Sequence, residues 1–286
     1  SSGGSGDVTQ SGLAAGHIPI RTTNEFAVTI SSRGIANGQS TITNNGAMYG
    51  VDTPGTTTSG IQEAINNAWN KGTNFGPTIA TLNLQFGDGI FYYSNVITIS
   101  NLYTSAVRWS GQSQLGTTWA YAGVSTVTNT IIVTGGDNTN GSSLDIPMHL
   151  YISDGTFTAL TNSTNVLLSI DHVSSTLLER LNFTGWNVRT NQETGSGVSM
   201  YPTAATHAPG LVGFRINQDY DHNCTIDNIY FAGLAVGARM KSDHIVASNL
   251  KFAMISYGSY GSTNIWHTNS IYSIGAGIIN EGSSYD

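Results

Sequence analysis

The chain has 286 residues, of which only 9% are charged, against about 25% in an average soluble protein. Its net charge of −7 and pI near 5.3 argue against nucleic-acid binding, which needs a basic surface. No apolar run approaches the roughly 18 residues of a transmembrane helix. Cys224 is the single cysteine, so an intrachain disulfide and the cysteine-rich zinc sites are excluded, and we expect a buried thiol.

The N-terminal part of the chain divides into an arm and a helix. Residues 1–50 show no helical period and are rich in Gly, Ser, Thr and Asn, which predicts an extended, partly strand-forming arm. A helix is predicted at about residues 59–71, because apolar residues from Ile61 to Trp69 fall at helical spacing and Ser59 is available as a cap. We expect this helix to cover one end of a β-structure; the alternative is a partner-binding helix.

The remainder of the chain is a series of short strands with an internal repeat. Glycine turns separate strands within residues 80–93, 95–99 and 106–111. Further on, residues 211–219 and 235–243 share one pattern at an offset of 24. The residues in register are Val212 and Val236, Gly213 and Gly237, Arg215 and Arg239, Ile216 and Met240, and Asp219 and Asp243. A period of this length is typical of a solenoid, in which each unit buries its apolar face against the next.

Asparagine marks the same position in successive repeats. Asn228, Asn249 and Asn269 recur at intervals of 21 and 20, and asparagine tolerates the left-handed backbone needed where a strand turns a corner. Residues 176–183 fit this frame about 48 residues before the segment that ends at Phe231, which predicts two solenoid turns between them. An antiparallel sandwich is the alternative, but it has no reason to keep residues in fixed register.

These features resemble the pectate-lyase-like right-handed parallel β-helix superfamily over about residues 50–280. The matching features are Asp52, the helix, the strand at 81–86, the segment Gly87-Asp-Gly-Ile-Phe-Tyr92, and the strands at 97–99 and 107–111. The Gly87–Tyr92 segment lacks the Pro and Ala of the superfamily's usual turn. The resemblance implies an all-β fold, a right-handed single-stranded parallel β-helix over residues 51–286 with an N-terminal capping α-helix. It implies no activity, since the superfamily includes lyases, hydrolases, viral tailspikes and inert surface proteins.

One polar face of the repeat contains the candidate binding residues. Apolar and polar residues alternate, so Arg215 and Asn217 face outward, as do Arg239 and Lys241 on the next strand. The two arginines would lie about 4.8 Å apart and repel each other unless carboxylates, for which Asp219 and Asp243 are the candidates, or a bound anion lie between them.

Two interpretations of this face stay open. One is a surface salt-bridge ladder, in which each pair contributes about 0–1 kcal/mol. The other is a glycan-binding surface, in which the planar arginine groups bind sugar hydroxyl or carboxylate groups. The glycan-binding candidates are Arg215, Asn217, Arg239, Lys241 and Asp243.

The turn at residues 220–222 is a candidate catalytic site. Arg215 and Phe231 are 16 residues apart, whereas Arg239 and Phe252 are 13 apart, so the turn carries extra residues. Solenoids place functional insertions in such turns. The candidate acid and base residues are Asp219, Asp221 and His222, and Asp219 with Asp221 could also bind a divalent cation such as calcium. The alternative is a solvated loop that bonds its own backbone.

The superfamily's catalytic motifs are incomplete in this chain. Asn217-Gln-Asp219 and Arg239-Met-Lys241 weakly resemble the first and last polygalacturonase motifs, but no Asp-Asp or Gly-His-Gly lies between them. No motif enforces the calcium-binding carboxylates of a pectate lyase either. We therefore leave enzymatic activity open, favour its absence, and expect no cofactor or structural metal.

The sequence as a whole favours an extracellular or virion-surface structural protein of the tailspike or fibre type that attaches to cell-surface carbohydrate. Residues 1–50 would join it to a larger particle or fibre. We expect a homo-oligomer, such as a trimer, because the strand pattern continues to Ile279 without an evident cap. The alternative is a secreted polysaccharide lyase or glycoside hydrolase acting on an acidic glycan.

Overall fold

The computed structural model describes residues 25–31, 47–73, 81–100, 106–124, 126–135, 148–160, 165–185, 211–217, 223–241, 244–253 and 276–280. In this part of the chain the regular structure is one helix and two β-sheets, and every strand pair is parallel. The predicted all-β class with parallel strands is confirmed. None of the helical structure described is long and apolar enough to cross a membrane.

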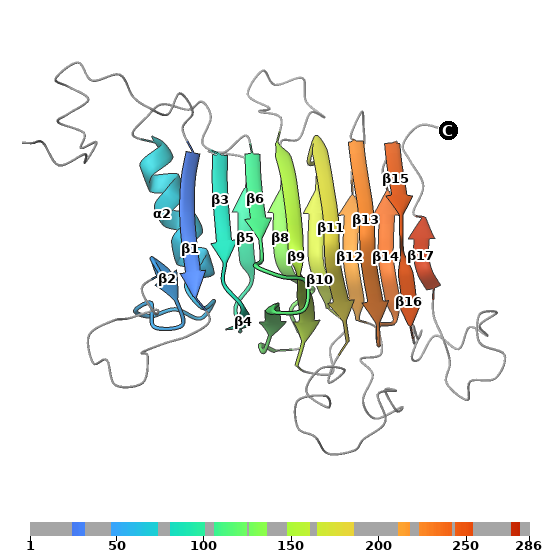
Figure 1. Ribbon diagram of the computed structural model, residues 1–286, viewed down its shortest axis with the longest axis horizontal. Coiled ribbons are helices and arrows are strands. Elements are labelled where there is room, and N and C mark those ends of the chain that lie inside the picture. Colours follow the sequence, from blue (N-terminus) through green and yellow to red (C-terminus); the bar gives the residue numbers. More distant parts are fainter. Residues whose placement is uncertain are drawn as a thin grey trace, which may run out of the picture.

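The chain alternates between the two sheets, so that successive strands of each sheet lie side by side along the long axis (Figure 1). The first sheet consists of β1 (Glu25–Ser31), β2 (Tyr49–Gly50), β3 (Thr81–Phe86), β4 (Gly89–Tyr93), β6 (Ala106–Ser110), β7 (Thr117–Tyr121), β9 (His149–Ala159), β11 (Ser175–Thr184), β13 (Asn223–Ala232), β15 (His244–Ser248) and β16 (Lys251–Ala253). The second sheet consists of β5 (Ile97–Ser100), β8 (Asn129–Thr134), β10 (Val166–Asp171), β12 (Val212–Asn217), β14 (Val236–Lys241) and β17 (Ala276–Asn280).

The register between neighbouring strands confirms one repeat and corrects another. On β12 and β14, Val212 pairs with Val236 and Arg215 with Arg239, which is the predicted offset of 24. On β11 and β13, however, Phe183 pairs directly with Phe231, so these strands are neighbours and the prediction of two turns between them is wrong. The reason is the long connection between β11 and β12, which extends one turn to 48 residues.

Four stacked residues turn the corner within the first sheet. Asp154, Arg180, Asn228 and Asn249 have φ angles of 59°, 51°, 53° and 53°. The residue before each is a register partner of its counterparts, so the four lie next to one another on successive strands; we call them the left-handed column. The left-handed backbone predicted at Asn228 and Asn249 is confirmed, whereas Asn269 lies outside the described residues.

A column of aromatic side chains fills the core behind this corner. Its members, the aromatic column, are the register partners Phe91, Trp119, Phe157, Phe183, Phe231 and Phe252. From Trp119 onward the ring centroids of successive members are 4.5, 5.1, 5.7 and 4.9 Å apart. Parallel in-register pairing places equivalent side chains above one another, so aromatic residues repeated along the sequence stack within the core.

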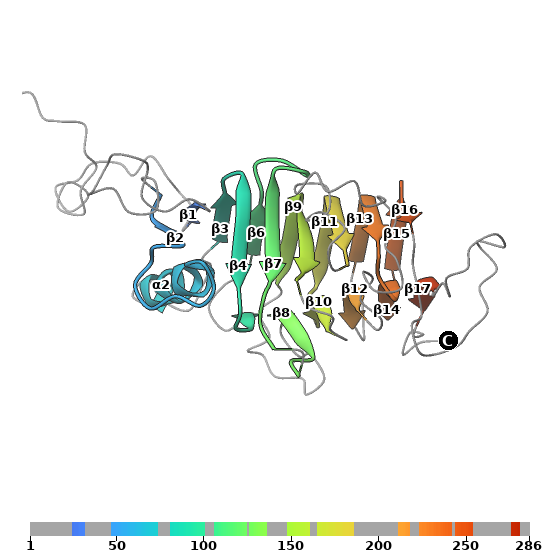
Figure 2. The same cartoon turned by 90° about the horizontal axis from the view of Figure 1, so that it is seen from below.

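The helix α2 (Ile61–Thr73) lies at one end of the sheets, beside β1, β2 and β5 (Figures 1 and 2). Ile61, Ala64 and Ile65 are fully buried, so the predicted helix and the core-facing position of its apolar stripe are confirmed. Trp69 belongs to the predicted stripe, but its side chain lies outside the described part of the structure. The packing of α2 removes apolar surface from water at this end of the core.

The predicted cap of this helix is wrong. The Gln62 amide donates a 3.1 Å hydrogen bond to the hydroxyl of Thr58, not to that of Ser59. Ser59 has a φ of 53°, and its hydroxyl instead donates to the Tyr92 carbonyl at 2.5 Å. The Thr58 hydroxyl also donates to Glu63 at 2.9 Å, so one threonine joins the first turn to an acidic side chain near the positive end of the helix dipole.

Part of the predicted N-terminal arm belongs to the first sheet. β1 pairs with β3 over six residues, and Ile30 is 1% exposed in the core. The attachment of residues 1–50 to a larger particle or fibre stays a prediction.

Candidate functional site

The outward face of the second sheet holds the predicted glycan-binding residues. Ser169, Arg215 and Arg239 are register partners on β10, β12 and β14, and Asp171, Asn217 and Lys241 form the adjacent row. We call these six residues the second-sheet face; Ser169 is buried at 1% exposure, and the other five are partly exposed. The alternate residues Phe214 and Ile216 are buried at 1% and 0% exposure, which confirms the predicted inward and outward alternation.

Asp171 supplies a carboxylate that the sequence argument did not include. Its two oxygens accept hydrogen bonds from the Asn217 amide at 3.3 Å and from the Ser169 hydroxyl at 3.1 Å. Asp171 is one strand away from Arg215 and in the same row as Lys241. Neighbouring strands are about 4.8 Å apart, so the face presents closely spaced guanidinium, ammonium, amide and carboxylate groups on a rigid sheet.

The remaining predicted site residues cannot be placed with this face. Asp219, Asp221, His222 and Asp243 lie outside the described residues, so the catalytic, calcium-binding and fifth glycan-binding assignments stay predictions. Among the residues that the structure does describe, no group of three or more His, Cys, Asp or Glu side chains could hold a metal ion.

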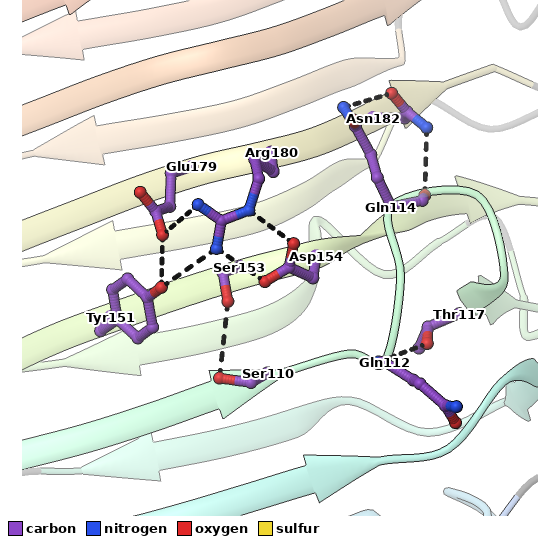
Figure 3. Close-up of polar contacts among 10 residues, drawn as sticks. All are labelled: Ser110, Gln112, Gln114, Thr117, Tyr151, Ser153, Asp154, Glu179, Arg180 and Asn182. Carbon is purple, nitrogen blue, oxygen red and sulfur yellow. Dashed lines mark hydrogen bonds and ion pairs between the residues drawn. The ribbon is translucent and has the colours of Figure 1, made fainter.

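A second polar cluster surrounds Arg180 in the left-handed column (Figure 3). The Arg180 guanidinium donates to both carboxylate oxygens of Asp154, at 2.6 and 2.9 Å, and pairs with Glu179 at 2.6 Å. It also donates to the Tyr151 hydroxyl at 3.4 Å, and that hydroxyl donates to Glu179. This Arg180 network therefore joins β9 to β11 through a bidentate ion pair and a phenol–carboxylate hydrogen bond.

The pKa values in this region follow from the same contacts. The hydrogen bond from Arg180 holds the pKa of Asp154 below its usual value, and the Asp154 carboxylate raises the pKa of Arg180. On the next strands, hydrogen bonds from Ser248 and Asn249, at 2.6 and 2.7 Å, lower the pKa of Asp227. These acids are thus stabilised as carboxylates and are poorly suited to donate a proton at neutral pH.

A short loop takes the place of the left-handed column on the preceding strands. This loop, residues 111–116 between β6 and β7, lies against β9 and β11. The Gln114 side chain donates to Asn182 at 3.0 Å (Figure 3). The Gln114 carbonyl accepts from the Thr156 hydroxyl at 2.9 Å. The Asn182 amide also donates to the Gln114 carbonyl at 3.2 Å and to the Thr156 hydroxyl at 3.1 Å, so these contacts hold the loop against β9 and β11.

The Arg180 network was not predicted, although the sequence contained a signal for it. In the repeat frame Arg180 occupies the position of Asn228, where the backbone is left-handed. Arginine is not a residue that favours this backbone, so its presence indicates a role for the side chain. The side chain bonds two carboxylates and a phenol, which makes a structural link between strands its main role.

Cys224 is not a candidate nucleophile. It is 1% exposed, and burial raises its thiol pKa to about 12. The prediction of a buried thiol that packs as a small apolar residue is confirmed.

Compared with known proteins, the chain matches no protein-family model, and no curated protein and no solved structure is significantly similar to it. The second-sheet face and the Arg180 network therefore rest on geometry alone. Of the two, the second-sheet face has the wider range of polar groups, with guanidinium, ammonium, amide and carboxylate groups on neighbouring strands.

Proposed function

We propose that this chain is a right-handed parallel β-helix that serves as a rod-like surface protein and attaches to carbohydrate. The fold proposal is supported by strands that are all parallel and by the regular passage of the chain between two sheets. Crossover connections between parallel strands of one sheet are right-handed in about 98% of cases, which favours a right-handed helix. The left-handed column bends the chain at the same position in successive turns of the proposed helix.

The second-sheet face is the observation that carries the binding proposal. Two arginines, a lysine and an asparagine stand in two rows across neighbouring strands, with the alternate residues fixed in the core. Guanidinium and amide groups recognise vicinal hydroxyl and carboxylate oxygens, and the sheet fixes the backbone that carries these groups before the ligand binds. The low charge of the chain leaves a polar surface suited to a carbohydrate ligand.

The proposal includes an extracellular or virion-surface location, attachment of the rod to a larger particle through residues 1–50, and a homo-oligomeric assembly. A hydrolase or lyase is the rival function. Its candidate residues, Asp219, Asp221 and His222, lie outside the described residues, so no observation of the structure favours it.

Glycan binding to a matched pair of variants tests the proposal. Arg215→Ala combined with Arg239→Ala should weaken retention of the bound glycan about tenfold or more, because two charge-assisted contacts are lost. Arg108→Ala is the control, since Arg108 is an exposed arginine on β6 of the first sheet. Binding to a panel of acidic and neutral polysaccharides, read with the unfolding temperature, gives the comparison.

Three results would overturn the proposal. One is that no polysaccharide binds the unaltered chain, and another is that the double variant and Arg108→Ala weaken binding equally. An equal loss of folding and binding in the double variant would mean that the arginine rows are a structural ladder. Release of new reducing ends or unsaturated products from the panel would instead establish the rival enzyme.

A further inference from the structure

The charges of the second-sheet face are unevenly placed along the rod. Its cationic residues, Arg215, Arg239 and Lys241, are on β12 and β14, and we call them the cationic half. Its one carboxylate, Asp171, is on β10. Beyond Asp171 the same two rows continue onto β8 and β5 with uncharged residues: Thr98, Ser100, Ile132 and Thr134. From β5 to β14 the outward surface therefore changes from uncharged to cationic, with Asp171 at the boundary.

Two side chains hold the Asp171 carboxylate in place. The Ser169 hydroxyl donates to Oδ2 at 3.1 Å, and the Asn217 amide donates to Oδ1 at 3.3 Å. Ser169 is 1% exposed, whereas Asp171 is partly exposed, so a buried hydroxyl fixes a carboxylate that reaches the surface. Each carboxylate oxygen can accept more than one hydrogen bond, so Asp171 can also accept from a ligand hydroxyl.

The same contact sets the orientation of the Asn217 amide. Its Nδ2 donates to Asp171, so the planar amide directs the acceptor Oδ1 away from that carboxylate. We call Asp171 and Asn217 the acceptor half of the face. It suits the hydroxyl groups of a neutral sugar, which donate hydrogen bonds. A ligand carboxylate has no proton to donate and would be repelled by Asp171.

We propose that the acceptor half binds a neutral sugar and that the cationic half binds the carboxylate of an adjacent acidic sugar. The preferred ligand is then a glycan that combines acidic and neutral sugars, rather than a polymer with a carboxylate on every sugar. This inference rests on the proposed carbohydrate binding and goes beyond it by naming the class of glycan.

The spacing of the strands allows both contacts at once. Asp171 and Lys241 belong to one row and are two strands apart, which is about 9–10 Å. A ligand carboxylate bound at Lys241 would therefore not contact Asp171. Arginine has five N–H donors, so Arg215 and Arg239 can bind a ligand while they keep contacts within the chain.

Binding of polysaccharides grouped by charge tests the ligand class. Polygalacturonate has a carboxylate on every sugar, and dextran has none. Half methyl-esterified polygalacturonate and hyaluronan combine acidic and neutral sugars. The tightest-binding polymer of the unaltered chain should belong to this mixed group, by about tenfold or more over polygalacturonate and dextran.

The ratio of the affinities for mixed polymer and polygalacturonate tests the role of Asp171. Asp171→Asn removes the negative charge and lets the Asn217 amide turn its N–H groups to the ligand, so the ratio should fall about tenfold. Asp227→Asn is the matched control and should leave the ratio unchanged. Asp227 also accepts from a serine and an asparagine, Ser248 and Asn249, but lies on the first sheet. A loss of stability alone would weaken both affinities and leave the ratio unchanged.

Asn217→Ala separates the two members of the acceptor half. It should weaken binding of the mixed polymers without strengthening that of polygalacturonate, because Asp171 still repels a carboxylate. An unchanged ratio in Asp171→Asn, or an equal change in Asp227→Asn, would overturn the role of Asp171 while carbohydrate binding stands. Tightest binding of a fully acidic or a neutral polymer would overturn the ligand class. Failure of the unaltered chain to bind any polysaccharide would instead contradict the proposed function itself, and this inference with it.

Discussion

The aromatic column and the left-handed column are built on the same strands and differ in what holds them together. Phe157 and Asp154 are both on β9, and Phe183 and Arg180 are both on β11. From Phe91 to Phe231 the rings are buried and pack by apolar contact, whereas the corner residues are held by ion pairs and hydrogen bonds near solvent. One parallel register therefore produces two ladders of unequal strength, since burial of an aromatic ring stabilises a fold more than an exposed ion pair does.

The largest expected effect comes from the middle of the aromatic column. Phe183 is fully buried, with ring centroids of Phe157 and Phe231 at 5.1 and 5.7 Å. Phe183→Ala should lower the free energy of unfolding by about 3–5 kcal/mol, because the cavity loses contacts on both sides. Phe252→Ala is the comparison, since Phe252 is 39% exposed and should cost less. Denaturant unfolding measures both, and equal losses would contradict a continuous buried column.

A smaller effect is expected where the two columns meet. Gly155 follows Asp154 directly, and a Cβ there would overlap the Trp119 ring. Gly155→Ala should destabilise by about 1–3 kcal/mol, because the indole is fully buried and cannot move aside without strain. Gly87→Ala provides the control, since a Cβ at Gly87 would meet only the Ile30 carbonyl oxygen at 4.0 Å. Thermal unfolding of the two variants should separate them clearly.

The left-handed column should respond more weakly. Arg180→Ala removes the contacts with Asp154 and Glu179, but the Arg180 side chain is 43% exposed, so the ion pairs contribute only about 1 kcal/mol or less. Arg180→Asn should cost less than Arg180→Ala, because asparagine adopts the left-handed backbone more readily. Denaturant unfolding of the two variants would contradict this account if Arg180→Asn were the less stable.

The smallest effect is the pH dependence of the same contact. Because the pKa of Asp154 is lowered in the folded chain, its contribution is fully present above the ordinary value of 3.8 and is lost as pH falls through the lowered value. Asp154→Asn should therefore flatten the acid side of the stability profile slightly. Unfolding temperatures from pH 7 to pH 2.5 test this, and identical profiles for both proteins would mean that titration of Asp154 does not contribute to the acid-side loss of stability.

Sequence reasoning was most successful where a residue's neighbours are set by the repeat. The 24-residue offset, the inward and outward alternation from Val212 to Asn217, and the left-handed asparagines are all local consequences of parallel pairing. Sequence reasoning failed where the number of residues between two positions does not indicate how far apart they lie in space. The 48 residues that separate Phe183 from Phe231 span one strand step, because an inserted connection adds length without adding a turn.

The candidate site was only partly predictable for a related reason. Arg215, Asn217, Arg239 and Lys241 share one face because the repeat contains them all. Asp171 lies 46 residues before Asn217 and outside the recognisable repeat, so its hydrogen bond to Asn217 could not be predicted. Ser59 was assigned as the helix cap from residue type alone, but the cap depends on φ, and at Ser59 the backbone is left-handed.

The connections between the two sheets differ greatly in length, which shows that this fold accepts long insertions between its strands. The link from β11 to β12 spans residues 185–211, whereas the next link, from β13 to β14, spans only residues 233–235. Both leave the strands on either side in register with their neighbours. Because the entropic cost of closing a loop grows slowly with its length, a foreign peptide inserted into the link from β11 to β12 should leave the strands on either side intact. Repeated along the rod, such grafts would present epitopes at intervals set by the spacing of β-strands.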